Sequence, residues 1–204
     1  MATATPTLRF TADQYDLMIR AGVFASPTGA GALPDQPPRV ELIRGEIVMM
    51  SPIGPRHEEL VDRLAAWSFA SVPPGMVRIR IQQSLGIPER DSVPQPDVAW
   101  VRPRDYGAER PRAADALLVI EVADTSVQFD LGEKAALYAA GGVADYWVVA
   151  AAEQVIHVLR SPRPPGYAVH RVVGRGETIT PLASATLGAS QASLAADLLF
   201  PTLP

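Results

Sequence analysis

Residues 96–101, PDVAWV, and residues 117–122, LLVIEV, decide how this chain of 204 residues folds. Both segments are short and apolar, and a polar loop separates them, which predicts two neighbouring β-strands. If the strands form an antiparallel hairpin, Asp97 at the start of the first lies beside Glu121 at the end of the second. Because side chains alternate along a strand, both carboxylates are able to point to one face of the sheet.

The pair Asp97 and Glu121 predicts a binding site for Mg²⁺ or Mn²⁺. Adjacent carboxylates repel each other, and each resists burial, so a divalent cation between them relieves both penalties. Magnesium commonly uses only one or two protein carboxylates, which leaves positions for water and phosphate. The same residues allow a second interpretation, in which Glu121 pairs with Arg78 or Arg80 in the core and Asp97 only caps a loop.

The rest of the chain adds helices and strands around this pair. Thr11 and Asp130 each begin a capping-box pattern. Arg44-Gly45 is typical of a hairpin turn, and Gly141-Gly142 of a helix end. Apolar stripes occur at residues 15, 17, 18 and 23 and at residues 60, 61, 64 and 67. Helices are expected at about 12–23, 57–70, 130–140 and 193–199, and further strands at 40–50, 77–82, 146–149, 155–159 and 167–173. This order predicts an α/β fold in which helices flank a mixed central β-sheet, with an added N-terminal β-hairpin.

Length and composition set the domain organisation and the cellular setting. Residues 1–38 are expected to form an N-terminal arm with a short helix and a flexible loop at 25–38, and residues 39–204 a single domain. There is no cysteine, which excludes disulfides and thiolate metal sites. No apolar run is long enough to cross a bilayer and no signal pattern is visible, so a cytoplasmic location is expected. The net charge of −4 argues against a strong general nucleic-acid binder but allows a locally basic groove.

Several motifs, in a fixed order, resemble the PD-(D/E)XK nuclease superfamily and, within it, the Uma-two family of restriction-endonuclease-like proteins. The motifs are residues 40–46 (VELIRGE), 50–52 (MSP), 57 (H), 95–97 (QPD), 119–122 (VIEV), 130–134 (DLGEK) and 138–147 (YAAGGVADYW). The likeness extends from about Thr11 to Phe200 and depends on the order and spacing of the motifs. It implies a restriction-endonuclease-like core and Mg²⁺-dependent hydrolysis of DNA, with Asp97 and Glu121 as the metal ligands.

The catalytic lysine departs from the superfamily pattern. The usual lysine would fall at Ala123, two residues after Glu121, and the Uma-two pattern instead offers a lysine on the next helix, here Lys134. The family's usual proline is also missing from residues 123–126. Of 18 basic residues, 17 are arginine and only Lys134 is lysine, which indicates that this position requires a compact ammonium. We expect Lys134→Arg and Lys134→Ala to lower cleavage strongly with little effect on folding; simple pairing of Lys134 with Asp130 is the alternative.

Two further residues match the family motifs. Glu41 is either an additional acidic residue of the site or an exposed strand glutamate. His57 either contacts a phosphate or a metal-bound water, or is held at the start of its helix by a local hydrogen bond. A local basic patch is expected from arginines 102, 104, 110 and 112 around the loop 103–116, and from the strand arginines 78 and 80, although solvated arginines are the simpler interpretation.

These features predict a metal-dependent endodeoxyribonuclease that acts as a homodimer and uses no organic cofactor. The expected catalytic residues are Asp97, Glu121, Lys134, Glu41 and His57. The main alternative is a nuclease-like domain without turnover that binds DNA or another protein, which the acidic charge and the missing strand lysine favour. A nuclease for RNA or branched DNA is a third possibility.

Overall fold

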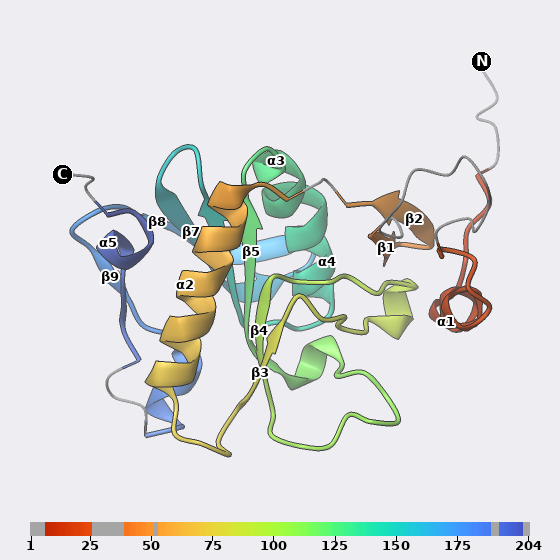
Figure 1. Cartoon of the computed structure of the whole chain (residues 1–204), viewed down its shortest axis with the longest axis horizontal. Coiled ribbons are helices and arrows are strands. Elements are labelled where there is room, and N and C mark those ends of the chain that lie inside the picture. Colours follow the sequence, from red (N-terminus) through yellow and green to blue (C-terminus); the bar gives the residue numbers. More distant parts are fainter. Residues whose placement is uncertain (1–6, 26–38, 51–52, 189–191, 202–204) are drawn as a thin grey trace. The chain divides into compact units, whose positions relative to one another are not determined.

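The computed structural model describes residues 7–25, 39–50, 53–188 and 192–201, which form two compact units (Figure 1). The first unit contains the chain up to residue 52 together with residues 86–94, and the second contains residues 53–85 and 95–204. Most of the loop expected at 25–38, and Ser51-Pro52 of the 50–52 motif, lie outside the described residues.

The first unit contains a short helix and a two-stranded hairpin. Helix α1 (Ala12–Arg20) begins with the expected capping box, in which the Thr11 side chain accepts a hydrogen bond from the backbone of Gln14 and the Gln14 side chain from the backbone of Thr11. Strands β1 (Val40–Ile43) and β2 (Glu46–Met49) pair antiparallel. The hairpin turn has positive φ at Arg44 (49°) and Gly45 (81°), as its two-residue geometry requires. The predicted N-terminal hairpin is therefore confirmed.

A small apolar core holds this unit together. Tyr15 of α1 packs with Val40, Leu42 and Val93, and its hydroxyl donates a hydrogen bond to the Val40 carbonyl at 2.8 Å. The apolar stripe expected on α1 is only partly right, because Leu17 and Val23 are 58% and 60% exposed. Tyr15 is therefore the buried residue through which α1 packs into this core.

The second unit contains the predicted α/β core. Its central sheet has six strands in the order β3-β4-β5-β6-β7-β8, in which β5 and β6 are parallel and all other neighbours antiparallel. The sequence of helix, three strands, helix and strand is confirmed. The elements are α2 (Pro55–Ser71), β3 (Arg78–Ile81), β4 (Val98–Val101), β5 (Ala116–Ala123), α3 (Val127–Phe129), a π-helical turn (Asp130–Lys134), α4 (Ala135–Ala140), β6 (Asp145–Ala150), β7 (Val155–Arg163), β8 (Gly166–Val173), β9 (Thr178–Ile179), β10 (Leu194–Ala195) and α5 (Ala196–Leu199).

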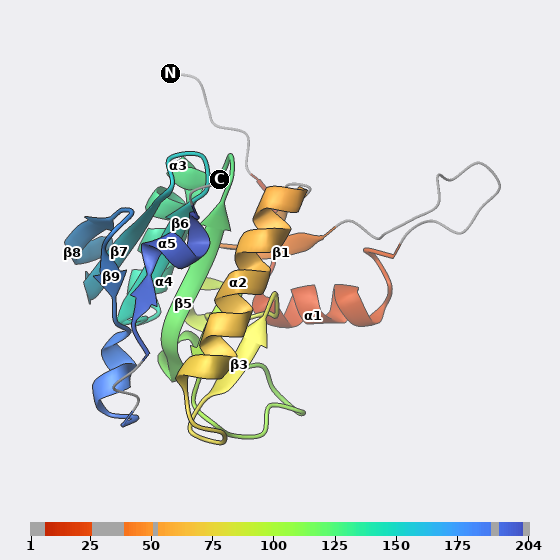
Figure 2. The ribbon, with the colours of Figure 1, turned by 60° about the vertical axis from the view of Figure 1, so that its left-hand side comes forward.

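Helix α2 covers one face of this sheet (Figure 2). Trp67 of α2 stacks on Trp100 of β4 with ring centroids 5.2 Å apart, and the Trp100 Nε1–H donates to Ser68 Oγ at 2.9 Å. The opposite face belongs to the segment from α3 to α4, where Tyr138 packs against Tyr146 with centroids 4.9 Å apart. The middle strands are buried on both faces, which explains their nearly continuous apolar sequences.

The helix after β5 begins earlier than the sequence predicts. The capping-box interpretation of Asp130 is wrong, because α3 already begins at Val127 and Asp130 lies inside the helical segment. The Asp130 carboxylate is buried and accepts a hydrogen bond from Ser126 Oγ at 2.5 Å, so it does not cap a free helix end. The predicted glycine end is confirmed, with Gly141 as the C-cap and Gly142 at φ 81°.

Asp145 anchors the middle of the sheet to the C-terminal part of the chain. Its buried carboxylate accepts hydrogen bonds from Arg160 Nε, the Trp147 indole N–H and the Leu182 backbone N–H, each at 2.8 Å. These contacts join β6, β7 and the segment that follows β9. Asp145 is thus a buried aspartate with a structural role, and it provides a control for the aspartate of the candidate site.

Candidate active site

Asp97 and Glu121 lie at the same end of the paired strands β4 and β5. Val98 pairs with Ile120 and Ala99 with Val119, so Asp97, which immediately precedes β4, lies at the same end of this pair as Glu121. Glu121 alternates onto the face that α4 covers, whereas the Asp97 carboxylate contacts His57 at the start of α2. Asp97 and Glu121 are 5% and 3% exposed, respectively. Two carboxylates are therefore buried at this end of the strand pair.

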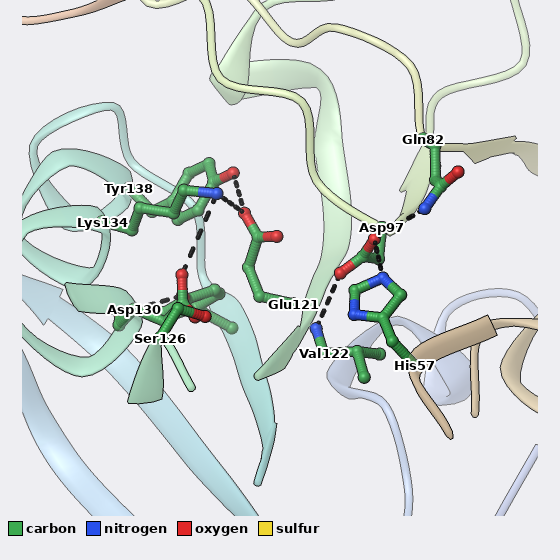
Figure 3. Close-up of polar contacts among 10 residues, drawn as sticks. His57, Gln82, Asp97, Glu121, Val122, Ser126, Asp130, Lys134 and Tyr138 are labelled. Atoms are coloured by element: carbon green, nitrogen blue, oxygen red, sulfur yellow. Dashed lines mark hydrogen bonds and ion pairs between the residues drawn. The ribbon is translucent and has the colours of Figure 1, made fainter. Parts of the chain in front are cut away.

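Asp97 is held by three donors (Figure 3). His57, in the first turn of α2, has Nε2 2.9 Å from Oδ1, and the Gln82 side-chain amide donates to the same oxygen at 3.1 Å. The Val122 backbone N–H donates to Oδ2 at 2.8 Å. Gln82 follows β3 with φ 50°, and its backbone N–H also donates to the Asp97 carbonyl. The end of β3 and the start of α2 thus converge on one carboxylate.

These contacts keep Asp97 ionised despite its burial. Burial by itself would raise the pKa of Asp97, but the hydrogen bond and charge of His57, the Val122 N–H and the Gln82 amide together lower the pKa below its ordinary value. The carboxylate is consequently an anion at neutral pH. An anion that is fixed by its surroundings is able to hold a cation without reorganising.

We expect the stabilising contribution of Asp97 to be lost in acid. Its folded-state pKa is lowered, so its contribution to the free energy of unfolding is complete above the unfolded pKa of about 3.9 and is lost as pH falls through the folded value. Urea unfolding of the wild type and of Asp97→Asn at a series of pH values measures this contribution. The difference between the two proteins should shrink below about pH 4. A difference that persists unchanged in acid would contradict the prediction.

Glu121 is bound from the helical segment on the other side of β5. Lys134 Nζ lies 3.0 Å and the Tyr138 hydroxyl 2.8 Å from Glu121 Oε1 (Figure 3). Lys134 is itself only 5% exposed and lies 3.9 Å from Asp130 Oδ1. The charged partner that the structure shows for Glu121 is Lys134, in place of the strand arginine that the alternative interpretation required. Pairing of Lys134 with Asp130 is present as well, but at the longer distance.

A π-helical turn sets the direction of Lys134. The turn spans Asp130–Lys134, and the Ala135 backbone N–H reaches back to the Asp130 carbonyl, which also accepts the Tyr146 hydroxyl at 3.0 Å. Such wide turns are rare and frequently occur at functional sites. Ala123, where the superfamily lysine would fall, is buried at the end of β5. The ammonium beside Glu121 therefore comes from the helical segment and not from the strand.

The remaining site residues differ in what the structure shows of them. His57 is held by the hydrogen bond to Asp97 described above, so the residue that it contacts is itself a member of the candidate site. Glu41 lies in β1 of the first unit and is 3% exposed, so the alternative of an exposed strand glutamate is wrong. A catalytic role of Glu41 stays a prediction.

Two side chains that contact the carboxylates were not expected from the sequence. Gln82 ends the alternating strand pattern of β3, and nothing in that pattern indicates that the backbone turns to positive φ there. Tyr138 was expected only to pack, although its spacing of four residues from Lys134 places both on one helix face. That spacing is the signal by which Tyr138 could have been found.

The site was tested for its fit to a divalent metal. Within the parts of the chain that the structure describes, no group of three or more His, Asp or Glu side chains is arranged to hold a metal ion. Magnesium requires fewer, because it commonly takes one or two carboxylates and completes its shell with water and phosphate. The carboxylates of Asp97, just before β4, and of Glu121 in β5 have the hard oxygen atoms that magnesium prefers. The residues therefore fit a magnesium site built on two carboxylates.

The core and its paired carboxylates define the class of protein, which has a restriction-endonuclease-like α/β fold. The chain belongs to the Uma2 family, because the family model described as "Putative restriction endonuclease" matches residues 31–195. Its structure is similar to the crystal structure of a putative nuclease belonging to DUF820 from Anabaena variabilis ATCC 29413, with a TM-score of 0.66, 19% identity, and 94% of this chain and 97% of that chain covered. That likeness supports the shared fold. No curated protein matches the chain.

In the described part of the chain, no helix combines the length and the apolar character needed to cross a bilayer.

Proposed function

We propose that this protein is an endonuclease that hydrolyses DNA phosphodiester bonds with Mg²⁺ or Mn²⁺ as its cofactor. Membership of the family supports a nuclease of the restriction-endonuclease type. The observation that carries the finer proposal is that Asp97 and Glu121 are buried at one end of the β4–β5 pair, with the Lys134 ammonium 3.0 Å from Glu121. An anion pair beside a buried ammonium provides both a cation site and a donor for a phosphate.

The proposed reaction adds water across a P–O bond. The water oxygen bonds to phosphorus, the bond to the leaving oxygen breaks, and a proton moves to that oxygen. Asp97 and Glu121 would hold the metal, which when bound supplies positive charge to the phosphate and lowers the pKa of a bound water. No cysteine is present as a nucleophile.

The chain's own residues would position and stabilise this reaction. The hydrogen bonds from His57 and Gln82 fix the direction of the Asp97 carboxylate, which makes both of them positioning residues. Lys134 has three N–H donors, so it is able to bind Glu121 and present a further donor where charge develops on the phosphate. Tyr138 shares Glu121 with Lys134 and limits the directions that this carboxylate adopts.

Cleavage assays with defined substrates test the proposal. Single-stranded, double-stranded and branched DNA, and RNA, are incubated with wild-type protein in Mg²⁺, in Mn²⁺ and in chelator, beside Asp97→Asn. Cleavage of DNA that requires metal and Asp97 is the expected result. Equal cleavage by Asp97→Asn, or no cleavage of any substrate in either metal, would refute it.

The second candidate is a nuclease-like domain without turnover that binds DNA or protein. The observation that favours it is the engagement of Glu121 Oε1 by both Lys134 and Tyr138, which occupies that oxygen with internal contacts. The alanine at position 123, where the superfamily carries lysine, points the same way. Binding of DNA without cleavage in the same assays would favour this candidate.

We expect the protein to form a homodimer, since enzymes that cut both strands commonly pair two sites by symmetry. Strand β8 is the last strand of the sheet order and carries Val169 and Val172, which are 46% and 48% exposed. An edge strand of this kind is able to pair with a second copy about a two-fold axis. Light scattering that shows only a monomer at working concentrations would contradict the expectation. In this proposal the protein meets its DNA in the cytoplasm.

A further inference from the structure

A cluster of arginines surrounds Tyr106 in the second unit. The guanidinium carbons of Arg78 and Arg80 on β3 lie 6.0 Å from the ring centroid, and that of Arg104 in the loop after β4 lies 5.1 Å from it. The Tyr106 hydroxyl donates to the Arg102 carbonyl at 3.0 Å, which fixes the loop around the ring. We call Arg78, Arg80 and Arg104 the arginine cluster. All three guanidinium groups lie within cation–π distance of this ring.

The positive charge of this cluster is only partly compensated. Arg104 pairs with Asp115 at 2.5 Å, and Arg78 donates to the Arg104 carbonyl at 3.3 Å. Among the described residues, the Nε of Arg80 is buried and has no hydrogen-bond partner. Burial and the neighbouring charges of Arg78 and Arg110 lower the pKa of Arg80. Since a guanidinium stays protonated in proteins, this crowding of charge favours the binding of an anion.

The arginine cluster lies on the sheet face that carries the candidate site. Arg80 pairs with Ala99, which pairs in turn with Val119, so its side chain alternates onto the same face as Glu121. Gln82, two residues after Arg80 and just beyond the end of β3, contacts Asp97 directly. At about 3.3 Å per residue, Arg80 and Arg78 lie about 7 and 13 Å along the strand from Gln82. A nucleic-acid strand rises about 3.4 Å per nucleotide, so this spacing covers a few nucleotides.

We propose that the arginine cluster binds backbone phosphates of the nucleic-acid strand, next to the phosphate that the candidate site would cut. The inference rests on the proposed function, because it assigns the cluster to the same strand. Guanidinium groups bind phosphate oxygens in a two-pronged geometry and have no acceptor of their own. On a protein with a net charge of −4, the cluster would direct the strand to this edge of the sheet.

Binding measurements without metal test this inference separately from cleavage. Fluorescence anisotropy follows labelled single-stranded DNA, double-stranded DNA and RNA of two unrelated sequences, in chelator, over a range of salt concentrations. Arg78→Gln and Arg80→Gln should each weaken binding about 10- to 100-fold, as expected for the loss of a charged hydrogen bond. The loss should be equal for both sequences, and the slope of log affinity against log salt should fall by about one.

Matched variants and substrates distinguish the outcomes. Arg171 on β8 pairs with Glu177 at 2.8 Å outside the cluster, so Arg171→Gln should bind as the wild type does. Arg80→Lys should keep the salt slope, and thermal unfolding confirms that each variant is folded. Affinity should rise with oligonucleotide length, whereas a site for free phosphate would be blocked by inorganic phosphate and would show no dependence on length.

Wild-type affinity and slope in both glutamine variants would overturn the inference, as would a wild type that binds no nucleic acid. Binding that depends on the arginine cluster but brings no cleavage in Mg²⁺ or Mn²⁺ would instead refute the proposed function and leave this inference standing. Cleavage by a protein whose binding of nucleic acid does not depend on Arg78 or Arg80 would support the proposed function and refute this inference.

Discussion

Lys134→Ala is expected to lower the free energy of unfolding by about 3–5 kcal/mol, because it leaves buried carboxylates without their cation. Glu121 and Asp130 are each 3% exposed, and Lys134 lies 3.0 and 3.9 Å from them. The same variant should lose cleavage by a factor on the order of 10²–10³, as expected for the loss of one transition-state donor. Urea unfolding and metal-dependent cleavage per folded molecule measure the two effects.

The expected loss of stability differs from the sequence-based expectation that replacing Lys134 would have little effect on folding. An exposed lysine would be replaced with little effect on folding, but Lys134 is enclosed by Glu121, Asp130 and Tyr138. Lys134→Arg introduces a broader group into this space, which costs about 1–3 kcal/mol in a packed interior. We still expect it to cleave poorly. Full activity in Lys134→Arg would show that only positive charge matters there.

A double variant separates stability from activity at this position. Lys134→Met with Glu121→Gln removes both charges of the closest buried pair, so it should be more stable than Lys134→Ala. Both proteins should be inactive, since each lacks the ammonium. Full activity in Lys134→Ala would show that Lys134 has no part in the mechanism. An unchanged free energy of unfolding in this variant would show that Glu121 and Asp130 do not require its charge to stay buried.

Asp97→Asn is expected to reduce cleavage by a factor on the order of 10³. A bound metal contributes several kcal/mol of charge stabilisation, and each 1.36 kcal/mol corresponds to about a tenfold change in rate. The variant also loses stability. Asp97 accepts from His57, Gln82 and Val122, whereas asparagine has one acceptor oxygen, so at least one buried donor faces an amide N–H₂ and costs about 1–3 kcal/mol.

Asp145→Asn is the matched control for this prediction. Asp145 is also a buried aspartate with a backbone N–H donor, from Leu182, but its cation partner is Arg160 and it lies in the structural anchor of β6. The control should lose stability and keep its cleavage rate per folded molecule. If Asp145→Asn lost as much activity per folded molecule as Asp97→Asn, the role of Asp97 would be reduced to folding.

The sequence predicted the parts of the site that depend on regular patterns. The apolar runs around Asp97 and Glu121 predict strands, and antiparallel pairing brings the start of the first strand to the end of the second. The register between Val98 and Ile120 follows from that geometry. The single lysine of the chain indicated Lys134, and the helix that carries it was expected from its glycine end.

The parts that could not be predicted depend on contacts between segments far apart in the chain. Gln82 reaches Asp97 only because the backbone takes a left-handed conformation after β3, which is unusual for glutamine. Asp130 has the pattern of a helix cap, but its burial beside Lys134 outweighs that local preference. Similarly, Arg78 and Arg80 form a plain alternating strand pattern until the loop brings Tyr106 against them.

The π turn at Asp130–Lys134 makes the direction of the ammonium depend on how many residues the helix contains, as well as on which residues they are. Each residue advances an α-helix by about 100°, so deleting Gly132 would rewind the turn and swing Lys134 by that angle relative to α3. Nearly every motif residue would survive such a deletion, but the lysine would no longer point at Glu121. In relatives of this protein, a gap of one residue at this turn therefore carries more meaning for activity than many substitutions elsewhere in the helix.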